Sequence, residues 1–370
     1  MTPSGFDRLT KAGMKLLIEQ GAGDPAGFPD SEYEAKGAKL VSRAEVFAQA
    51  DVILQVRTLG ANPDAGEADT KHLRKGQIVI GMAEPLTALH QIATLAKAGV
   101  TLFAMELITH ITRAQAMDAL SSMATVAGYR AVLAGAQASA RMFPMLTTAA
   151  GTIAPAKVFV LGVGVAGLQA LATAKRLGAV CSAYDVRAAA REQAESVGAK
   201  FIALEIESSA AEGSGGYAKA MDEEFYRKQR ELLTKVLRDK DVVITTAAVP
   251  GRKAPILITA EMVRAMHPGA VIVDMAAERG GNCELTRAGE TVVEAGVTIL
   301  GITNLPSESA YHASQMYAKN VATLLEHLAP KGALALNLSD EIIRETLVTH
   351  EGAAVHPRVA ALLAPVLVEG

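Results

Sequence analysis

The sequence has few cysteines, no large excess of either charge and no long hydrophobic run. Its two cysteines, Cys181 and Cys283, belong to no Cys-x-x-Cys or Cys/His cluster, so we expect free thiols, a reducing compartment and no structural zinc. Basic residues number 36 and acidic residues 39, and no basic tract offers a surface for nucleic acid. No apolar run reaches the roughly 18–20 residues of a membrane span. Residues 1–4 are typical of a helix cap and not of a targeting segment. These absences predict a soluble protein that reaches a membrane only through a partner.

The composition favours an α/β protein of two domains. The chain has 370 residues, half of them hydrophobic, and Ala, Val, Leu and Gly are abundant, as in proteins with buried parallel strands. Hydrophobic periodicity predicts helices over residues 2–20, 118–142 and 306–328, and strands over residues 52–56, 77–82, 100–105, 157–161, 179–184, 201–203, 242–246, 270–274 and 297–301. We expect two Rossmann-like, doubly wound domains linked by long helices. The first comprises residues 1–117 and 310–370, and residues 118–309 form a nucleotide-binding domain inserted in it.

The first helix has no strand before it. An α/β domain rarely begins with a helix, so we expect that a first strand is missing from this sequence or is supplied by a later segment.

The strongest motif is a glycine-rich turn between a strand and a helix. Residues 157–161 form the strand, and Gly162-Val163-Gly164-Val165-Ala-Gly167 follows at once. In this context Gly162 permits a tight turn, Gly164 lets backbone N–H groups approach a pyrophosphate, and Gly167 lets the helix pack closely on the strand. The helix N-terminus adds partial positive charge. The motif therefore predicts a dinucleotide site.

An acidic residue selects the nucleotide. Asp185 lies 18 residues after Gly167, at the end of the next predicted strand. Its carboxylate can accept hydrogen bonds from both ribose hydroxyls and would repel a 2′-phosphate, so NAD(H) is favoured over NADP(H). Arg187 could instead pair with a phosphate.

Small polar side chains gather just before residue 123. On a helix, Gln115, Asp118, Ser121 and Ser122 lie three or four positions apart and share one face. Such a face suits a nicotinamide carboxamide and its ribose, although the same residues could be a polar cap of the helix.

A long polar segment interrupts the βα pattern at residues 207–230. It is a lid over the nicotinamide with Tyr217 at its tip, or a solvated linker. The histidines lack metal-ligand spacing, and we expect no metal site. Asp274 and Glu278 follow a predicted strand, where they contact a cofactor or cap a helix.

Several stretches together resemble one family. They are Arg113-Ala-Gln-Ala-Met-Asp-Ala-Leu-Ser-Ser122, Ala127-Gly-Tyr-Arg-Ala131, Phe143-Pro-Met-Leu-Thr-Thr-Ala-Ala-Gly-Thr152, Gly216-Tyr-Ala-Lys219 and Gly280-Gly-Asn-Cys283. Nearly the whole chain resembles the NAD(H)-binding subunits of proton-translocating nicotinamide nucleotide transhydrogenases, whose fold alanine dehydrogenases share.

The chemistry separates the two activities. Alanine dehydrogenases place an acid/base histidine after the strand equivalent to residues 77–82, whereas this chain reads Ile80-Gly-Met-Ala-Glu-Pro85 there. Arg57 takes the place of a substrate-binding lysine, and the segment that would carry an arginine is absent. Amino-acid oxidation needs that proton-transfer group, while direct hydride transfer between two nicotinamides needs no acid or base. The missing histidine favours the transhydrogenase.

The resemblance also implies roles for individual residues, none of them in acid–base catalysis. The nicotinamide and its ribose would be held by Gln115, Asp118 and Ser121, the pyrophosphate by Val163, Gly164 and Val165 with Gly162 and Gly167 shaping the turn, and the adenosine by Asp185, Val186 and Arg187. Gly216 and Tyr217 would form the lid, with Gln229 and Ala248 lining the site. His110 stands where the family often has an arginine that contacts the carboxamide.

The function implied is hydride transfer from NADH on this chain to NADP⁺ on a partner. The implied partners are an NADP(H)-binding subunit and a membrane-embedded proton-channel subunit, with this chain a cytoplasmic homodimer at the inner face of the cell membrane. Two alternatives remain open: an alanine-dehydrogenase-like oxidoreductase and a non-catalytic NAD(H) sensor.

Overall fold

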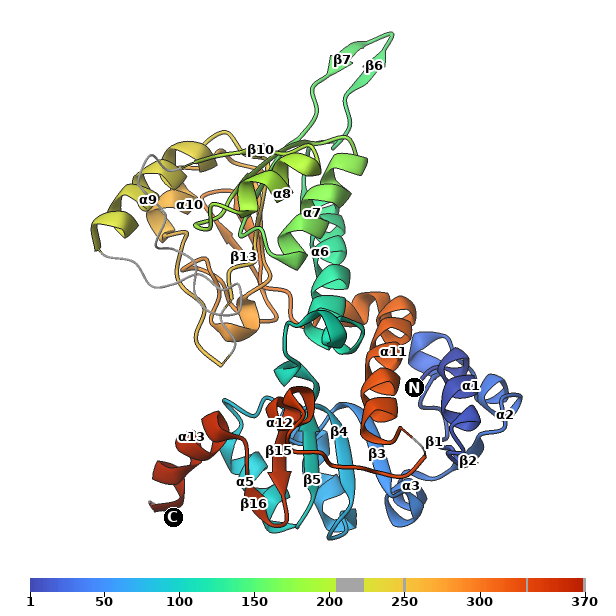
Figure 1. Cartoon of the computed structure of the whole chain (residues 1–370). Helices are drawn as coiled ribbons and strands as arrows, with labels where there is room; N and C mark the ends of the chain where they lie inside the picture. Colours follow the sequence, from blue (N-terminus) through green and yellow to red (C-terminus); the bar gives the residue numbers. More distant parts are fainter. Residues whose placement is uncertain (204–222, 249–250, 331, 369–370) are drawn as a thin grey trace. The chain divides into compact units, whose positions relative to one another are not determined.

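The chain folds into two compact units, shown in Figure 1. The computed structural model describes residues 1–203, 223–248, 251–330 and 332–368. Unit 1 comprises Met1–Met123 and Ser309–Gly370, and unit 2 comprises Ala124–Glu308. Helix α6 (Ala119–Ala138) begins in unit 1 and ends in unit 2, and the chain returns to unit 1 just before α11 (Ala310–Leu328).

Unit 2 is built around a seven-stranded sheet with the order β10-β9-β8-β11-β12-β14-β13. Its strands are β8 (Lys157–Leu161), β9 (Val180–Tyr184), β10 (Lys200–Phe201), β11 (Val242–Thr245), β12 (Val271–Asp274), β13 (Thr291–Glu294) and β14 (Val297–Leu300). Every pair is parallel except β13 with β14. The strand order reverses between β8 and β11, which is the position where open α/β sheets bind ligands.

Helices cover both faces of this sheet, and this explains its unbroken apolar strands. Alternate residues of β8 belong to opposite cores: Val158 and Val160 face α6, α7 (Val165–Arg176) and α8 (Ala190–Ser196), whereas Phe159 and Leu161 face α9 (Glu223–Leu237) and α10 (Ala260–Arg264). The predicted α/β class with doubly wound sheets is confirmed.

Glycines inside α6 let this helix pack closely. A Cβ atom at Gly128 would lie 2.2 Å from the carbonyl oxygen of Ala166 on α7, and one at Gly135 would lie 2.9 Å from Val242. These positions therefore require glycine for close packing of α6.

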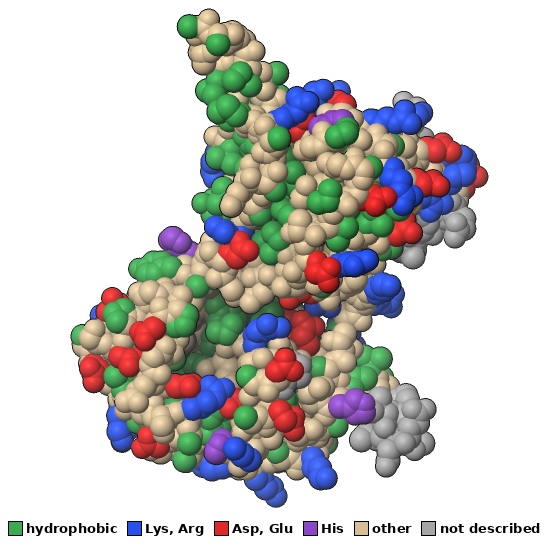
Figure 2. All heavy atoms as spheres, turned by 180° about the vertical axis from the view of Figure 1, so that it is seen from behind, with side chains coloured by type: hydrophobic (Ala, Val, Ile, Leu, Met, Phe, Trp, Pro, Cys, Tyr) green, Lys and Arg blue, Asp and Glu red, His purple; other side chains and the backbone are tan. Residues whose placement is uncertain are grey.

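A two-stranded hairpin projects from unit 2. It consists of β6 (Leu146–Thr148) and β7 (Gly151–Ile153). Residues 142–156 contain no charged side chain. Figure 2 shows this projection without basic or acidic side chains at its tip.

Unit 1 contains a five-stranded sheet with the order β16-β15-β5-β4-β3. Its strands are β3 (Val52–Arg57), β4 (Ile78–Met82), β5 (Thr101–Ala104), β15 (Leu347–His350) and β16 (Ala353–Ala354). One face packs on α11 and α12 (Glu341–Thr346), and the other on α3 (Arg43–Gln49), α5 (Leu89–Lys97) and α13 (Pro357–Val368). The remaining helices of the unit are α1 (Pro3–Lys11), α2 (Asp30–Glu34), α4 (Pro63–Gly66) and short 3₁₀ segments.

The prediction of one helix over residues 2–20 is wrong in its second half. Helix α1 ends at Lys11, and Gly13 has a φ of 83°, a left-handed conformation that ends helices. The chain then forms β1 (Leu17–Glu19), which pairs in parallel with β2 (Lys39–Val41) in a separate two-stranded sheet.

Among the helices that the structure describes, none combines the length and the apolar composition needed to cross a membrane.

Candidate nucleotide site

The turn after β8 has three glycines with three different roles. Gly162 has a φ of 101°, which disfavours any side chain. A Cβ atom at Gly167 would lie 1.9 Å from the carbonyl oxygen of Gly162, so only glycine lets α7 begin this close to the strand. Gly164 is different, because a Cβ atom there would meet no atom of the described residues within 4 Å apart from its two chain neighbours.

The open space at Gly164 lies beside the N-terminus of α7. Gly164 is the N-cap residue of this 12-residue helix and has no side chain that could cap the first N–H groups. Unpaired N–H groups and the helix dipole form a site for an anion. Val163 is buried and Val165 is 44% exposed, so the turn presents backbone on its open side. These features fit the pyrophosphate of a dinucleotide.

Asp185 lies directly after β9 and faces the same turn. Its Oδ2 accepts a hydrogen bond of 2.7 Å from the Val163 N–H, which ties the two loops together. Arg187 forms a bidentate contact with this carboxylate: Nε donates to Oδ1 at 2.9 Å and Nη2 donates to Oδ2 at 2.8 Å. In this structure the arginine therefore binds the acid that was predicted to bind ribose. Val186, between them, is partly buried.

Two segments flank the point where the strand order reverses: the glycine turn after β8 and the segment after β11. Thr246 donates a hydrogen bond of 2.9 Å to the carbonyl oxygen of Gly162, so this segment contacts the glycine turn. Asn282 is fully buried and clamps Ala247 by two hydrogen bonds, of 3.0 and 2.8 Å. Ala248 follows as an exposed residue. Sequence reasoning gave Asn282 no role of its own, although its Gly-Gly-Asn-Cys stretch was included in the resemblance.

Gln229 of α9 contacts the end of β9. It is 3% exposed, and its side-chain amide donates a 3.1 Å hydrogen bond to the Tyr184 hydroxyl at the end of β9. Burial raises the pKa of Tyr184, so its hydroxyl stays protonated at neutral pH.

In unit 1, Asp118 is the centre of a second polar cluster. Its carboxylate accepts hydrogen bonds from the Ser121 N–H at 2.8 Å and the Ser121 hydroxyl at 2.6 Å, so it caps α6. Nδ1 of His110 lies 3.2 Å from Asp118 Oδ2. The Ser122 hydroxyl donates to the main-chain carbonyl of Asp118.

The prediction of a single helical face over these residues is wrong. Gln115 lies in a separate 3₁₀ segment (Thr112–Met117), and Asp118 adopts an extended conformation between it and α6. The physical reason is the cap itself, because an N-cap residue leaves the helical region to accept the first N–H groups. The cluster joins His110, Asp118 and Ser121, while Gln115 is exposed beside it.

Sequence reasoning missed an acid at the carboxyl edge of the unit 1 sheet. Glu106 follows β5, and its Oε1 accepts hydrogen bonds from the N–H groups of Ala83 and Glu84, at 2.7 and 2.6 Å, just after β4. Its Oε2 is buried and has no partner among the described residues. Burial raises the pKa of Glu106 to about 7. The sequence did contain one indication of this residue, because Glu106 directly follows the strand predicted over residues 100–105.

Asp274 does not lie on an open surface. Asp274 is fully buried and accepts hydrogen bonds from Thr245, Ala276, Asn282, Cys283 and Thr286. This carboxylate organises the loop after β12. Glu278 is exposed in a short 3₁₀ turn.

The predicted lid residues Gly216 and Tyr217 lie outside the described residues. Within residues 1–203, 223–248, 251–330 and 332–368, no group of three or more His, Cys, Asp or Glu side chains could hold a metal ion.

Comparisons with known proteins agree with this architecture. Residues 1–127 match the model described as "Alanine dehydrogenase/PNT, N-terminal domain", and residues 131–357 match "Alanine dehydrogenase/PNT, C-terminal domain". The chain is 47% identical to an NAD(P) transhydrogenase alpha-subunit chain of Rhodospirillum rubrum, over 96% of this chain and 94% of the relative. It is 31% identical to "Alanine dehydrogenase" of Mycobacterium tuberculosis, over 97% and 91%. The crystal structure of transhydrogenase from Sinorhizobium meliloti superposes with a TM-score of 0.86 at 45% identity, covering 96% of this chain and 95% of that one.

Proposed function

Because this chain belongs to the alanine dehydrogenase/PNT family, we propose that it is the NAD(H)-binding subunit of a proton-translocating transhydrogenase. It would present NADH for direct hydride transfer to NADP⁺ held by a partner subunit. The observation that carries the proposal is the glycine turn after β8, where Gly164 leaves open space beside the first N–H groups of α7.

The residues of unit 2 would bind and select the nucleotide. The N–H groups that follow Gly164 would hold the pyrophosphate. Asp185 would accept hydrogen bonds from the adenosine ribose once Arg187 releases it, and its negative charge would disfavour a 2′-phosphate. Gln229 and Ala248 would line the site, and Gly216 and Tyr217 would cover it.

The residues of unit 1 would orient the nicotinamide. Asp118 and Ser121 form a preorganised pair at the start of α6, and Gln115 is an exposed amide beside it. His110, already in contact with Asp118, would donate a hydrogen bond to the carboxamide in place of an arginine. When bound, the nicotinamide supplies the hydride. The protein contributes orientation, water exclusion and nucleotide selectivity.

The partners follow from the proposed reaction. NADP(H) would bind a separate subunit, and a membrane-embedded subunit would carry the protons, so this chain would sit on the cytoplasmic face of the membrane. The uncharged hairpin of unit 2, with Met145 63% and Ile153 43% exposed, supports self-association as a homodimer.

The decisive experiment is hydride transfer from NADH to NADP⁺ or a spectrally distinct analogue, with the purified chain alone and with the NADP(H)-binding subunit. We expect activity only in the mixture. NADH binding without transfer in the mixture would favour an NAD(H) sensor. Alanine-dependent reduction of NAD⁺ by the chain alone would favour the second candidate, an amino-acid dehydrogenase like the relative of Mycobacterium tuberculosis.

A further inference from the structure

Gln115 is an exposed side chain on a short 3₁₀ segment of unit 1, Thr112–Met117. Two of its neighbours, Ala114 and Met117, are buried in the core of the unit. The hydrogen bonds within a 3₁₀ segment have poor geometry, so a segment of this kind is held mainly by its contacts with other elements. The place of Gln115 therefore depends on what the segment is tied to.

Asn320 of α11 makes the first of these contacts. Its Nδ2 donates a hydrogen bond of 2.9 Å to the main-chain carbonyl of Ala116, which lies 204 residues earlier in the chain. Asn320 is 5% exposed, and its Oδ1 is buried without a partner among the described residues. An unsatisfied buried acceptor destabilises a core, and an apolar side chain would avoid that cost. Asn320 is therefore explained by what its Nδ2 holds and not by packing.

Asp340, the N-cap residue of α12, makes the second contact. Its Oδ1 accepts a hydrogen bond of 2.8 Å from the Ile342 N–H, and its Oδ2 accepts one of 2.7 Å from Nη1 of Arg113. His327 of α11 lies beside it, with Nε2 3.3 Å from Oδ1. One carboxylate thus caps α12 and ties the 3₁₀ segment to it.

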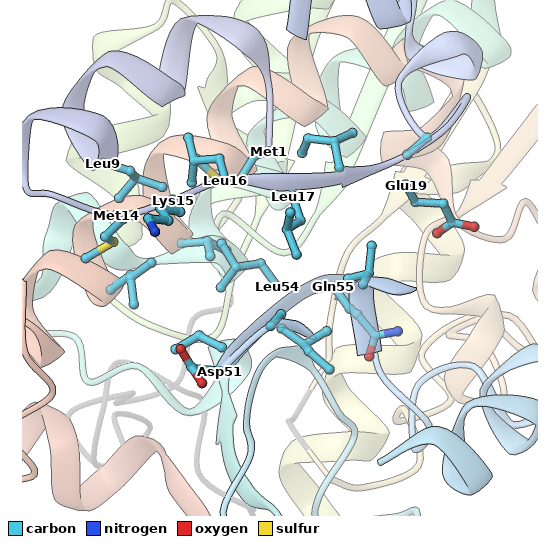
Figure 3. A pocket seen from close by; sticks show the side chains of 18 of the residues that line it. Met1, Leu9, Met14, Lys15, Leu16, Leu17, Glu19, Asp51, Leu54 and Gln55 are labelled. Atoms are coloured by element: carbon cyan, nitrogen blue, oxygen red, sulfur yellow. The ribbon is translucent and has the colours of Figure 1, made fainter. Parts of the chain in front are cut away.

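These contacts lie apart from the hollow of unit 1 that Figure 3 shows. Asn320 and His327 are seven positions apart and share one face of α11. The hollow lies against another face of this helix, where Val321 and Leu325 line it and Asn320 does not. A substitution at Asn320 therefore leaves the lining of the hollow unchanged.

We propose that Asn320 and Asp340 are positioning residues for the nicotinamide, because they hold the Thr112–Met117 segment at one point on each side of Gln115. The inference rests on the proposed function, in which Gln115 contacts the nicotinamide. Both residues act through the segment and make no contact with the nucleotide themselves. An amide that is already fixed in place binds the carboxamide without first having to be ordered, and it favours one orientation of the ring.

Asn320→Leu tests the first contact, since leucine has the same branched skeleton without a donor or acceptor. Ala116 is exposed, so water can replace the lost hydrogen bond to its carbonyl. Loss of the unsatisfied Oδ1 offsets the bulk of the methyl groups, so Tm should stay within about 4 °C of the wild type. We expect the Kd of NADH to rise at least about five-fold, while the Kd of ADP-ribose, which lacks the nicotinamide, changes less than about two-fold. Calorimetric titration with each ligand measures the two values.

The control for this variant is Thr346→Val. Thr346 is fully buried, and its hydroxyl donates only to carbonyls of its own helix, those of Ile342 and Ile343. The control therefore removes a buried polar group of unit 1 without touching the 3₁₀ segment. We expect it to leave the ratio of the two Kd values unchanged.

Arg113 gives an independent variant at the second contact. Arg113→Ala removes the hydrogen bond to Asp340 but leaves the cap of α12, and it should raise the Kd of NADH relative to that of ADP-ribose at least about three-fold. Arg113→Lys should restore most of the ratio, because an ammonium can also donate to one carboxylate oxygen. The matched control is Arg8→Ala, which removes an equally exposed arginine (47% against 50%) paired with Glu326 of α11 and should leave the ratio unchanged.

The outcomes separate the positioning role from the proposed function. An unchanged ratio in both Asn320→Leu and Arg113→Ala would overturn the positioning role and leave the proposed site intact. Equal weakening of both ligands with a lower Tm would also overturn it, because a purely structural residue has that effect. A wild type that does not bind NADH would contradict the proposed function and the positioning role together.

Discussion

At the scale of single residues, we propose that Asp185 selects between NAD(H) and NADP(H). It lies between the Val163 N–H and the Arg187 guanidinium, so one carboxylate fixes the loop and neutralises the arginine. Removing the acid frees a cation that can pair with a phosphate.

We expect Asp185→Ser to lose NADH affinity and to gain affinity for NADPH, changing the ratio of the two Kd values by about 10–100-fold. Fluorescence titration with each reduced nucleotide measures this. The chain contains no tryptophan, so protein emission interferes little. The control, Asp239→Ser, removes an exposed acid that pairs with Lys157 and should leave the ratio unchanged. An unchanged ratio in Asp185→Ser would rule out a role in selectivity.

Glu106 predicts a pH dependence of folding. Burial raises its pKa from 4.5 to about 7, so ionisation destabilises the folded state progressively as the pH rises from about 4.5 to 7. Glu106→Gln keeps an acceptor for the Ala83 and Glu84 N–H groups without the charge. At pH 8 the variant should exceed the wild type in unfolding free energy by up to about 3 kcal/mol.

At pH 4.5 this advantage should shrink to less than about 1 kcal/mol, because the wild-type carboxyl is then largely protonated when folded. Urea denaturation at the two pH values measures the difference. If the unfolding free energies of the two proteins changed with pH in parallel, ionisation of Glu106 would not destabilise the folded state.

At the scale of elements, two glycines of the turn after β8 allow its role in folding and its proposed role in nucleotide binding to be tested separately. Gly164→Ala places a methyl group in open space, whereas Gly167→Ala places one 1.9 Å from a carbonyl oxygen. We expect Gly164→Ala to fold with an unchanged Tm and to bind NADH at least about ten-fold more weakly. We expect Gly167→Ala to lose about 2–3 kcal/mol of unfolding free energy.

Thermal unfolding and NADH titration of both variants measure these effects. Normal NADH affinity in Gly164→Ala would mean that the pyrophosphate lies elsewhere, and the proposed site would be wrong.

The elements that local sequence determines were predictable. The strand, turn and helix around Gly162 were found because three glycine spacings and two apolar runs agree. The helix over residues 2–20 was not, because one glycine in a left-handed conformation ends α1 where the hydrophobic pattern continues. The prediction that Asp118 lies on a helical face was wrong because its side chain caps α6. A capping residue lies outside the helix and so cannot share a helical face.

Features set by distant contacts could not be read from the sequence. Asp274 accepts hydrogen bonds from five residues, and Asn282 clamps Ala247 from 35 residues away. No local sequence pattern predicts these hydrogen-bond partners. The pKa of Glu106 likewise depends on burial that only the folded sheet creates.

At the scale of the whole molecule, the hairpin of unit 2 predicts self-association. An isolated two-stranded hairpin is only marginally stable in water, and exposed apolar edges pair with other chains. The double variant Met145→Lys/Ile153→Lys should shift the chain from dimer to monomer at micromolar concentration, measured by light scattering after gel filtration.

The matched control is Val293→Lys, which charges an equally exposed residue (65%) on the edge strand β13 and should leave the dimer intact. A monomeric wild type, or a variant that stays dimeric, would contradict a role for the hairpin. NADH affinity should be the same in all three proteins if binding does not need the second copy.

The ion pair of Asp185 with Arg187 makes the arginine an internal competitor for the carboxylate. If the proposed site is right, a ribose must displace Arg187 from Asp185. The free energy of ribose binding at Asp185 is then reduced by the free energy of the ion pair that it breaks. Substitutions that weaken the ion pair between Arg187 and Asp185 would therefore increase the affinity for the nucleotide without adding a contact to it.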